Sequence, residues 1–289
     1  MLRRSFLSAP VAVPVLAADA GQTYHLRYAP RIGFLADVPI PRQLEIYAEN
    51  GFRGFEYNGL PRHELKEIET FRRKMDALKM SMGVFVVNSG GWKGDALVDS
   101  RFHDGFLRDV RRAVEIHKVI GNECATVTSG LAVKNLSFEQ QTKNTVEALK
   151  RAGDIVANTR MTLVLEPLNV RVDHAGYFVV FSEHAYQIMK SVNHPKVKIL
   201  FDIYHQQISE GNLINHILKY WDEIAYFQVG DVPGRKEPGT GEINYRNVFK
   251  AIHEKGYKGI LGMEHGLSIP GEAGLKKCFD EYRKADQFA

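Results

Sequence analysis

The feature that most constrains the fold is the regular alternation of short β-rich segments with amphipathic helical segments. Eight runs rich in β-branched, aromatic and other apolar residues are each followed by a helical pattern. Strands that alternate with helices indicate parallel βαβ units, and eight units predict a single-domain (β/α)8 barrel. The expected strands cover residues 25–35, 51–58, 80–88, 123–130, 162–169, 197–205, 224–231 and 259–266.

An open, doubly wound sheet is the alternative arrangement of the same elements. No Gly-rich fingerprint follows the first strand, so the sequence does not support dinucleotide binding. No linker or shift in composition divides the chain. Two helix starts are marked by polar residues: Ser137 and Gln140 form a capping-box pattern, and Ser182 is the expected N-cap of a later helix.

The first twenty residues do not fit the barrel pattern. A basic pair, Arg3 and Arg4, precedes an apolar stretch that ends in an A-x-A-like site at residues 18–20. The segment resembles a twin-arginine export leader; the alternative is a disordered tail. We therefore expect residues 1–20 to be a signal peptide and residues 21–289 to form the barrel. The expected location is the periplasm, or the cytoplasm if the leader is not functional.

The bulk composition excludes some partners. The formal charge is +4, and no run of Lys and Arg forms a basic stripe, so we expect no nucleic-acid partner. No apolar stretch reaches the ~20 residues that span a bilayer, so we expect no membrane insertion. Cys124 and Cys278 have no zinc-site spacing and would lie too far apart in a barrel for a disulfide bond. Homo-oligomerisation is left open.

Acidic and amide side chains stand at the ends of four successive predicted strands. They are Glu166, Asp202, Gln228 and Glu264. The C-terminal ends of barrel strands meet at one mouth, where three close carboxylates would repel one another. A divalent cation removes this conflict, and oxygen ligands favour Mn²⁺ or Mg²⁺. Any one of these residues alone would more often be a cap or part of an ion pair.

The segments "LVLEPLNVRVDHAGYF", "FDIYHQQISEG", "FQVGDVPGRKEPGTGEINY" and "GMEHG" resemble the hydroxypyruvate isomerase family of xylose isomerase-like barrels. The resemblance covers about residues 160–266. It implies that the four strand-end residues hold the metal and that Glu166 and Glu264 are the acid/base pair. It also implies that His205 and Arg235 contact substrate oxygens. The N-terminal half matches less well, because "RYAPRIGFL" replaces the usual first-strand segment.

The predicted chemistry is the movement of a carbonyl group between adjacent carbons. One carboxylate removes a proton beside the carbonyl and a carboxylate returns it, while a metal stabilises the enediolate. Three further residues are candidates for substrate binding. His205 follows Asp202 in a predicted loop, Asn169 follows Glu166, and Trp92 lies in a glycine-rich loop that could cover the substrate. Glu56 ends the second strand and could touch the substrate, but a salt bridge is its expected role.

Four functions are compatible with this pattern to different degrees. The first is a metal-dependent isomerase of hydroxypyruvate, tartronate semialdehyde or a small sugar. The second is an exported lyase or epimerase that acts on keto-sugars or 3-keto-glycosides. A nuclease is disfavoured because the strand ends carry the ligands of one metal and no basic stripe. A non-catalytic sugar-binding barrel is disfavoured because both Glu166 and Glu264 are present.

Overall fold

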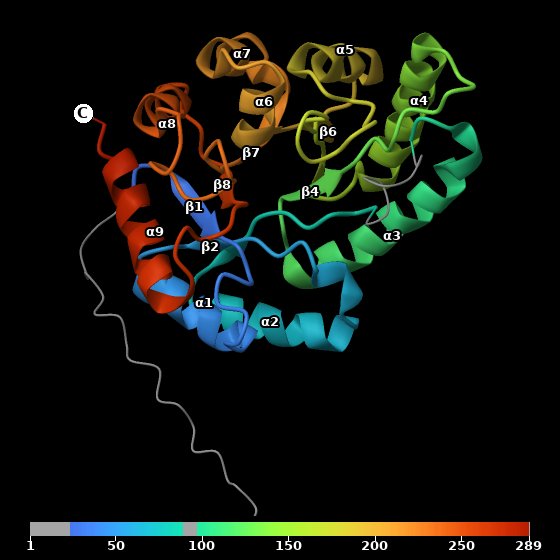
Figure 1. Cartoon of the computed structure of the whole chain (residues 1–289). Helices are drawn as coiled ribbons and strands as arrows, with labels where there is room; N and C mark the ends of the chain where they lie inside the picture. Colours follow the sequence, from blue (N-terminus) through green and yellow to red (C-terminus); the bar gives the residue numbers. More distant parts are fainter. Residues whose placement is uncertain (1–23, 89–96, 289) are drawn as a thin grey trace, which may run out of the picture.

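The computed structural model describes residues 24–88 and 97–288 and has a ring of parallel strands at its centre (Figure 1). The predicted leader lies outside the described residues. The strands are β1 (Arg27–Pro30), β2 (Gly54–Phe55), β3 (Ser81–Met82), β4 (Cys124–Val127), β5 (Thr162–Leu165), β6 (Val197–Asp202), β7 (Ile224–Gln228) and β8 (Ile260–Met263).

The ring is closed by two short contacts between separate sheets. One sheet has the order β1-β8-β7-β6-β5-β4, and the other pairs β2 with β3. Single parallel bridges join Arg31 to Glu56 and Val86 to Thr126, so β2 and β3 fill the gap between β1 and β4. The order is that of a closed barrel, which confirms the predicted fold and excludes the open sheet.

Helices surround the barrel (Figure 1). Helix α4 begins as predicted, because the Ser137 Oγ accepts a hydrogen bond from the Gln140 amide at 3.1 Å. Ser182 is the first residue of α5 rather than its cap, and its hydroxyl donates to Glu210. The helices are α1 (Ile40–Glu49), α2 (Leu65–Ala77), α3 (His103–Ile120), α4 (Phe138–Val156), α5 (Ser182–Val192), α6 (Ile203–Ser209), α7 (Leu213–Lys219), α8 (Tyr245–Glu254) and α9 (Gly271–Ala285).

The predicted strands are longer than the observed ones, and one helix was not predicted. The run 51–58 contributes only two residues to β2, and Glu56, directly after them, is joined to Arg31 by a single parallel bridge. Helix α6 begins directly after Asp202, whose carboxylate caps it by accepting from the Tyr204 amide at 2.9 Å. His205 therefore lies in a helix, and its predicted place in a loop is wrong.

Apolar side chains form two layers. A small cluster inside the barrel includes Ala29, Val84, Leu200 and Tyr226, each contributed by a different part of the ring. A larger cluster fills the space between the strands and the helices. Cys278 is buried there, and both cysteines are free, which confirms the prediction of no disulfide bond. None of the described helices is both long and apolar enough to cross a membrane.

The first strand is tied to the last helix by Asp286, just beyond α9. Its carboxylate accepts hydrogen bonds from the His25 amide at 2.6 Å and from the Tyr28 hydroxyl at 2.8 Å. Tyr28 is buried, so its hydroxyl depends on this acceptor. The contact joins segments about 260 residues apart in the sequence and so helps to close the barrel.

We expect Asp286→Ala to lower the free energy of unfolding by about 1–3 kcal/mol, because it leaves the buried Tyr28 hydroxyl without a partner. Urea unfolding followed by circular dichroism measures the change. Asp280→Ala is the control, since Asp280 forms exposed ion pairs that contribute at most about 1 kcal/mol. Equal losses in the two variants would show that Asp286 has no special role in closure.

Candidate active site

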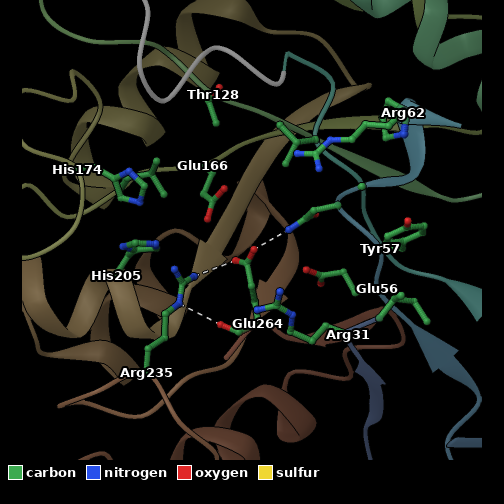
Figure 2. Close-up of a pocket in the computed structure, with 16 residues that line it drawn as sticks. Arg31, Glu56, Tyr57, Arg62, Thr128, Glu166, His174, His205, Arg235 and Glu264 are labelled. Carbon is green, nitrogen blue, oxygen red and sulfur yellow. Dashed lines mark hydrogen bonds and ion pairs between the residues drawn. The ribbon is translucent and has the colours of Figure 1, made fainter. Parts of the chain in front are cut away.

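A pocket of about 490 Å³ lies at the C-terminal ends of the strands (Figure 2). Its volume is in the usual range for small-molecule sites. Four of the residues predicted for the site, Glu166, His205, Arg235 and Glu264, line it. The other two strand-end residues, Asp202 and Gln228, are at most 1% exposed. The pocket therefore brings together side chains from β5 to β8 as the sequence predicts.

Arg235 is the central positive charge of the pocket. Its Nη2 donates to Glu264 Oε2 at 2.9 Å, and its Nε donates to the Glu264 carbonyl oxygen at 3.0 Å (Figure 2). The same Nη2 donates to Asp202 Oδ2 at 2.7 Å. The guanidinium also lies over the Tyr204 ring at 4.8 Å from the ring centroid. Arg235 thus holds two carboxylates near each other that would otherwise repel.

The loop that presents Arg235 is organised by a buried carboxylate, Asp231. Its side chain is fully buried, and no cation pairs with it among the described residues. Instead it accepts hydrogen bonds from backbone amides along the loop. The donors are Val232 at 2.9 Å, Gly239 at 3.0 Å, Gly241 at 2.8 Å and Ile243 at 3.1 Å. This network fixes the position from which Arg235 reaches the pocket.

We expect Asp231→Ala to lower the free energy of unfolding by more than about 3 kcal/mol, because several amides lose a charged acceptor at once. The loop that carries Arg235 should also become sensitive to limited proteolysis. Glu242→Ala, on the same loop, is the control, because its exposed carboxylate accepts a hydrogen bond from the Gln207 side chain and forms no ion pair with any described residue. If both variants unfold at the same urea concentration as the parent, Asp231 does not organise the loop.

Burial and mutual repulsion alter the acidity of the carboxylates. Burial, followed by the nearby Glu264 and Asp202, raises the pKa of Glu166 well above its usual value. Burial also raises the pKa of Asp202 to about 6, although Arg235 opposes the change. One guanidinium therefore does not compensate the negative charge of the site, and a cation bound there would be stabilised.

Three side chains offer atoms that could hold a metal ion. Ligand atoms of Glu166, Asp202 and His205 all lie within 4.8 Å of one another. Gln228 adds a buried Oε1 that has no hydrogen-bond donor among the described residues. An unpartnered buried carbonyl oxygen costs free energy unless something binds it, and a hard cation would do so. The donor set therefore fits a divalent cation, although this group contains His205 and not the predicted ligand Glu264.

The environment of His205 makes it a donor toward the pocket. Its Nδ1 lies 3.3 Å from the Asn169 amide and 2.7 Å from the Asn169 Nδ2. Asn169 cannot turn around, because its Oδ1 already accepts from the Val172 and Asp173 amides. With Nδ1 accepting, the proton of the neutral ring is on Nε2, which lies 3.6 Å from Asp202 Oδ2. Burial and Arg235 lower the pKa of His205 and keep the ring neutral.

Sequence reasoning missed several residues of this pocket. Glu56 was expected to form a salt bridge, but its carboxylate instead accepts from Gln228 and Tyr226. Asn58 donates to Glu264 Oε1 at 2.6 Å. Arg31 and Arg62 also line the pocket. Asn58 ends the second predicted strand and so carried this signal, whereas Arg31 lay inside the first predicted strand, which is longer than the observed β1.

The structure does not place every predicted site residue in the pocket. Asn169 does not face the pocket as a lining residue; it is fully buried and positions His205. Glu264 is linked to Asp202 through Arg235, as described above. Trp92, the expected cover of the substrate, lies outside the described residues. The assignment of Glu166 and Glu264 as acid and base stays a prediction.

Comparisons with known proteins agree with this arrangement. The profile of the family described as "Xylose isomerase-like TIM barrel" matches residues 44–284. Hydroxypyruvate isomerase of Escherichia coli (strain K12) is 30% identical over 89% of this chain and 100% of its own length. 2-Oxo-tetronate isomerase of Cupriavidus necator is 32% identical over 79% of this chain and 87% of its own.

A solved structure shows the same likeness in three dimensions. The AP endonuclease of family 2 from Brucella melitensis superposes with a TM-score of 0.78 at 28% sequence identity. The superposition covers 86% of this chain and 96% of that one. The likeness therefore extends over the whole barrel rather than a single motif.

Proposed function

The chain belongs to the xylose isomerase-like TIM barrel family, and we propose that it is a metal-dependent isomerase of a small hydroxy-carbonyl acid. The reaction interconverts a hydroxy-aldehyde and a ketone through an enediolate. Relatives named hydroxypyruvate isomerase and 2-oxo-tetronate isomerase support this reaction class. The observation that carries the proposal is the pocket itself, in which Glu166 and Glu264 both line the space where a substrate would lie.

The two glutamates have different surroundings, which suit different tasks. Glu264 is about 20% exposed and accepts hydrogen bonds from Asn58 and Arg235. It is placed to take a proton from the carbon beside the carbonyl. Glu166 is more deeply buried and comes from β5, across the barrel from β8. It is placed to exchange a proton with the adjacent carbon.

The remaining polar groups bind and orient the substrate. His205 offers its Nε2 proton to a substrate oxygen, and Asn169 keeps the ring in that tautomer. Glu166, Asp202 and Gln228 would hold a divalent cation, which as a Lewis acid would polarise the substrate oxygens. Glu264, the fourth predicted ligand, is bonded to Asn58 and Arg235 and would have to release one of them to join the set. Arg235 restrains Asp202 and Glu264 while the site is loaded.

We expect Glu264→Gln to reduce turnover by about 10²–10⁴-fold, because an amide offers an oxygen but cannot accept the proton. The measurement is deuterium incorporation in D₂O over a panel of keto-acids and ketoses with Mn²⁺ added. The exposed Glu242→Gln is the control and should keep full activity. The melting temperature should stay near that of the parent. Retention of more than about a third of the activity would refute the assignment of Glu264.

Two arginines indicate that the substrate carries a carboxylate. Arg31 and Arg62 both line the pocket, and neither guanidinium has a hydrogen bond or ion pair with any described residue. A guanidinium matches the geometry of a carboxylate and is commonly used to bind one. Hydroxypyruvate and 2-oxo-tetronate are both keto-acids, so the two arginines favour a substrate of that class over a neutral sugar.

We expect Arg31→Gln to raise the KM for a keto-acid substrate by about 10- to 100-fold, because a charge-assisted hydrogen bond is lost. The effect on kcat should be smaller, and any activity on neutral ketoses should not fall. Arg27→Gln is the matched control: Arg27 begins the strand that Arg31 follows, but it does not line the pocket, and its guanidinium donates to the Lys258 carbonyl. Equal losses on charged and neutral substrates would show that Arg31 does not recognise a carboxylate.

A further inference from the structure

Glu56 is a fully buried carboxylate whose role the proposed reaction leaves open. It lies directly after β2 and is 1% exposed. No ion pair with it occurs among the described residues. Its Oε1 accepts from Gln228 Nε2 at 2.8 Å, and its Oε2 accepts from the Tyr226 hydroxyl at 3.0 Å. Both donors come from β7, so the carboxylate is directed at one strand.

The barrel leaves space for this contact at two glycines. A Cβ at Gly262, on β8, would lie 1.7 Å from Glu56 Oε2. A Cβ at Gly83 would lie 2.2 Å from the Tyr226 hydroxyl oxygen. Any side chain at either position would displace the network. The contact between Glu56 and β7 therefore depends on the absence of a side chain at Gly262 on β8 and at Gly83 after β3.

The contact with Glu56 defines the orientation of the Gln228 amide. The amide turns its Nε2 toward Glu56 Oε1, which accepts the hydrogen bond. Its Oε1 then faces away from Glu56, and this atom is buried without a donor among the described residues. Gln228 is paired with Asp202 in the ladder between β6 and β7, so the two side chains leave the sheet at the same level.

We propose that Glu56 is a positioning residue that fixes the Gln228 amide so that its carbonyl oxygen is presented to a divalent cation. The inference rests on the metal site of the proposed function. Glu56 would act through Gln228 rather than by touching the substrate. Groups behind metal ligands commonly orient them in this way, and their loss weakens metal binding by about 10- to 100-fold.

The first test measures the dissociation constant for Mn²⁺ of metal-stripped protein by titration calorimetry. Glu56→Asp keeps the charge but shortens the side chain by one methylene, which withdraws it from Gln228. We expect the dissociation constant to rise about 10- to 100-fold. Tyr226→Phe is the control, because it removes only the donor to the other carboxylate oxygen, and it should stay within about threefold. An unchanged constant in Glu56→Asp would mean that the charge alone matters, and would overturn the proposal.

A double-mutant cycle with Gln228→Ala decides whether Glu56 acts through Gln228. Once Gln228 is removed, Glu56→Asp should cause no further loss of Mn²⁺ affinity. Additive losses, or an unchanged affinity in Gln228→Ala, would overturn the proposal. If Glu56→Asp does not fold, the isosteric Glu56→Gln takes its place in the cycle, because an amide no longer dictates which end of Gln228 it contacts.

The test of Glu56 and the test of the proposed isomerase function can fail independently of each other. Mn²⁺ binding is measured without substrate, so an additive cycle would remove the inference and leave the isomerase assignment intact. A coupled cycle in a protein that exchanges no deuterium with any keto-acid would remove the assignment and leave the inference intact. A parent protein that does not bind Mn²⁺ would refute both.

Discussion

The site depends on how the barrel manages negative charge that it cannot expose to water. Glu56, Glu166, Asp202 and Glu264 converge from four strand ends, and the first three are nearly or fully buried. Ionised carboxylates in such surroundings need compensating charge, and Arg235 contacts only two of them. The rise in the pKa of Glu166 and Asp202 is the consequence. A cation bound beside these carboxylates would compensate the negative charge that Arg235 leaves.

Buried acids elsewhere in the molecule show the opposite arrangement, in which every charge is satisfied by the chain. Asp231 accepts several backbone amides, and Glu237 accepts from the Ser268 amide at 2.9 Å and from Lys277 Nζ at 2.7 Å. These two acids hold the loops after β7 and β8 in place. The difference separates structural carboxylates from those left for chemistry, and it explains why Arg235 can be held rigidly beside the latter.

The sequence was sufficient to predict the barrel and the strand ends that meet at its mouth, because both follow from periodicity and the order of elements. It was not sufficient for contacts between distant residues. Glu56 and Gln228 are 172 positions apart, and no local pattern indicates that one would orient the other. Helix α6 was missed because a strand that runs directly into a helix leaves no polar turn to mark the change, so His205 was placed in a loop. Asn169 was expected in the pocket because it follows Glu166, and its position in the sequence does not reveal that its side chain bonds His205 instead.

Isomerisation, epimerisation and elimination all begin with removal of a proton beside a carbonyl group, so the carboxylates alone do not distinguish them. The residues that line the pocket bear on which substrate is bound, and so on which of these reactions follows. Arg31 borders both the pocket and a second cleft of about 540 Å³, whose walls include Phe34 and Leu267. A glycoside that filled both the pocket and the second cleft would have to extend past this guanidinium. A small keto-acid could fit in the pocket alone, with its carboxylate beside the guanidinium. Under the proposed function, the guanidinium at that boundary gives a compact anionic substrate an ion pair that an extended neutral one cannot form, and this difference in affinity is the basis of the proposed preference.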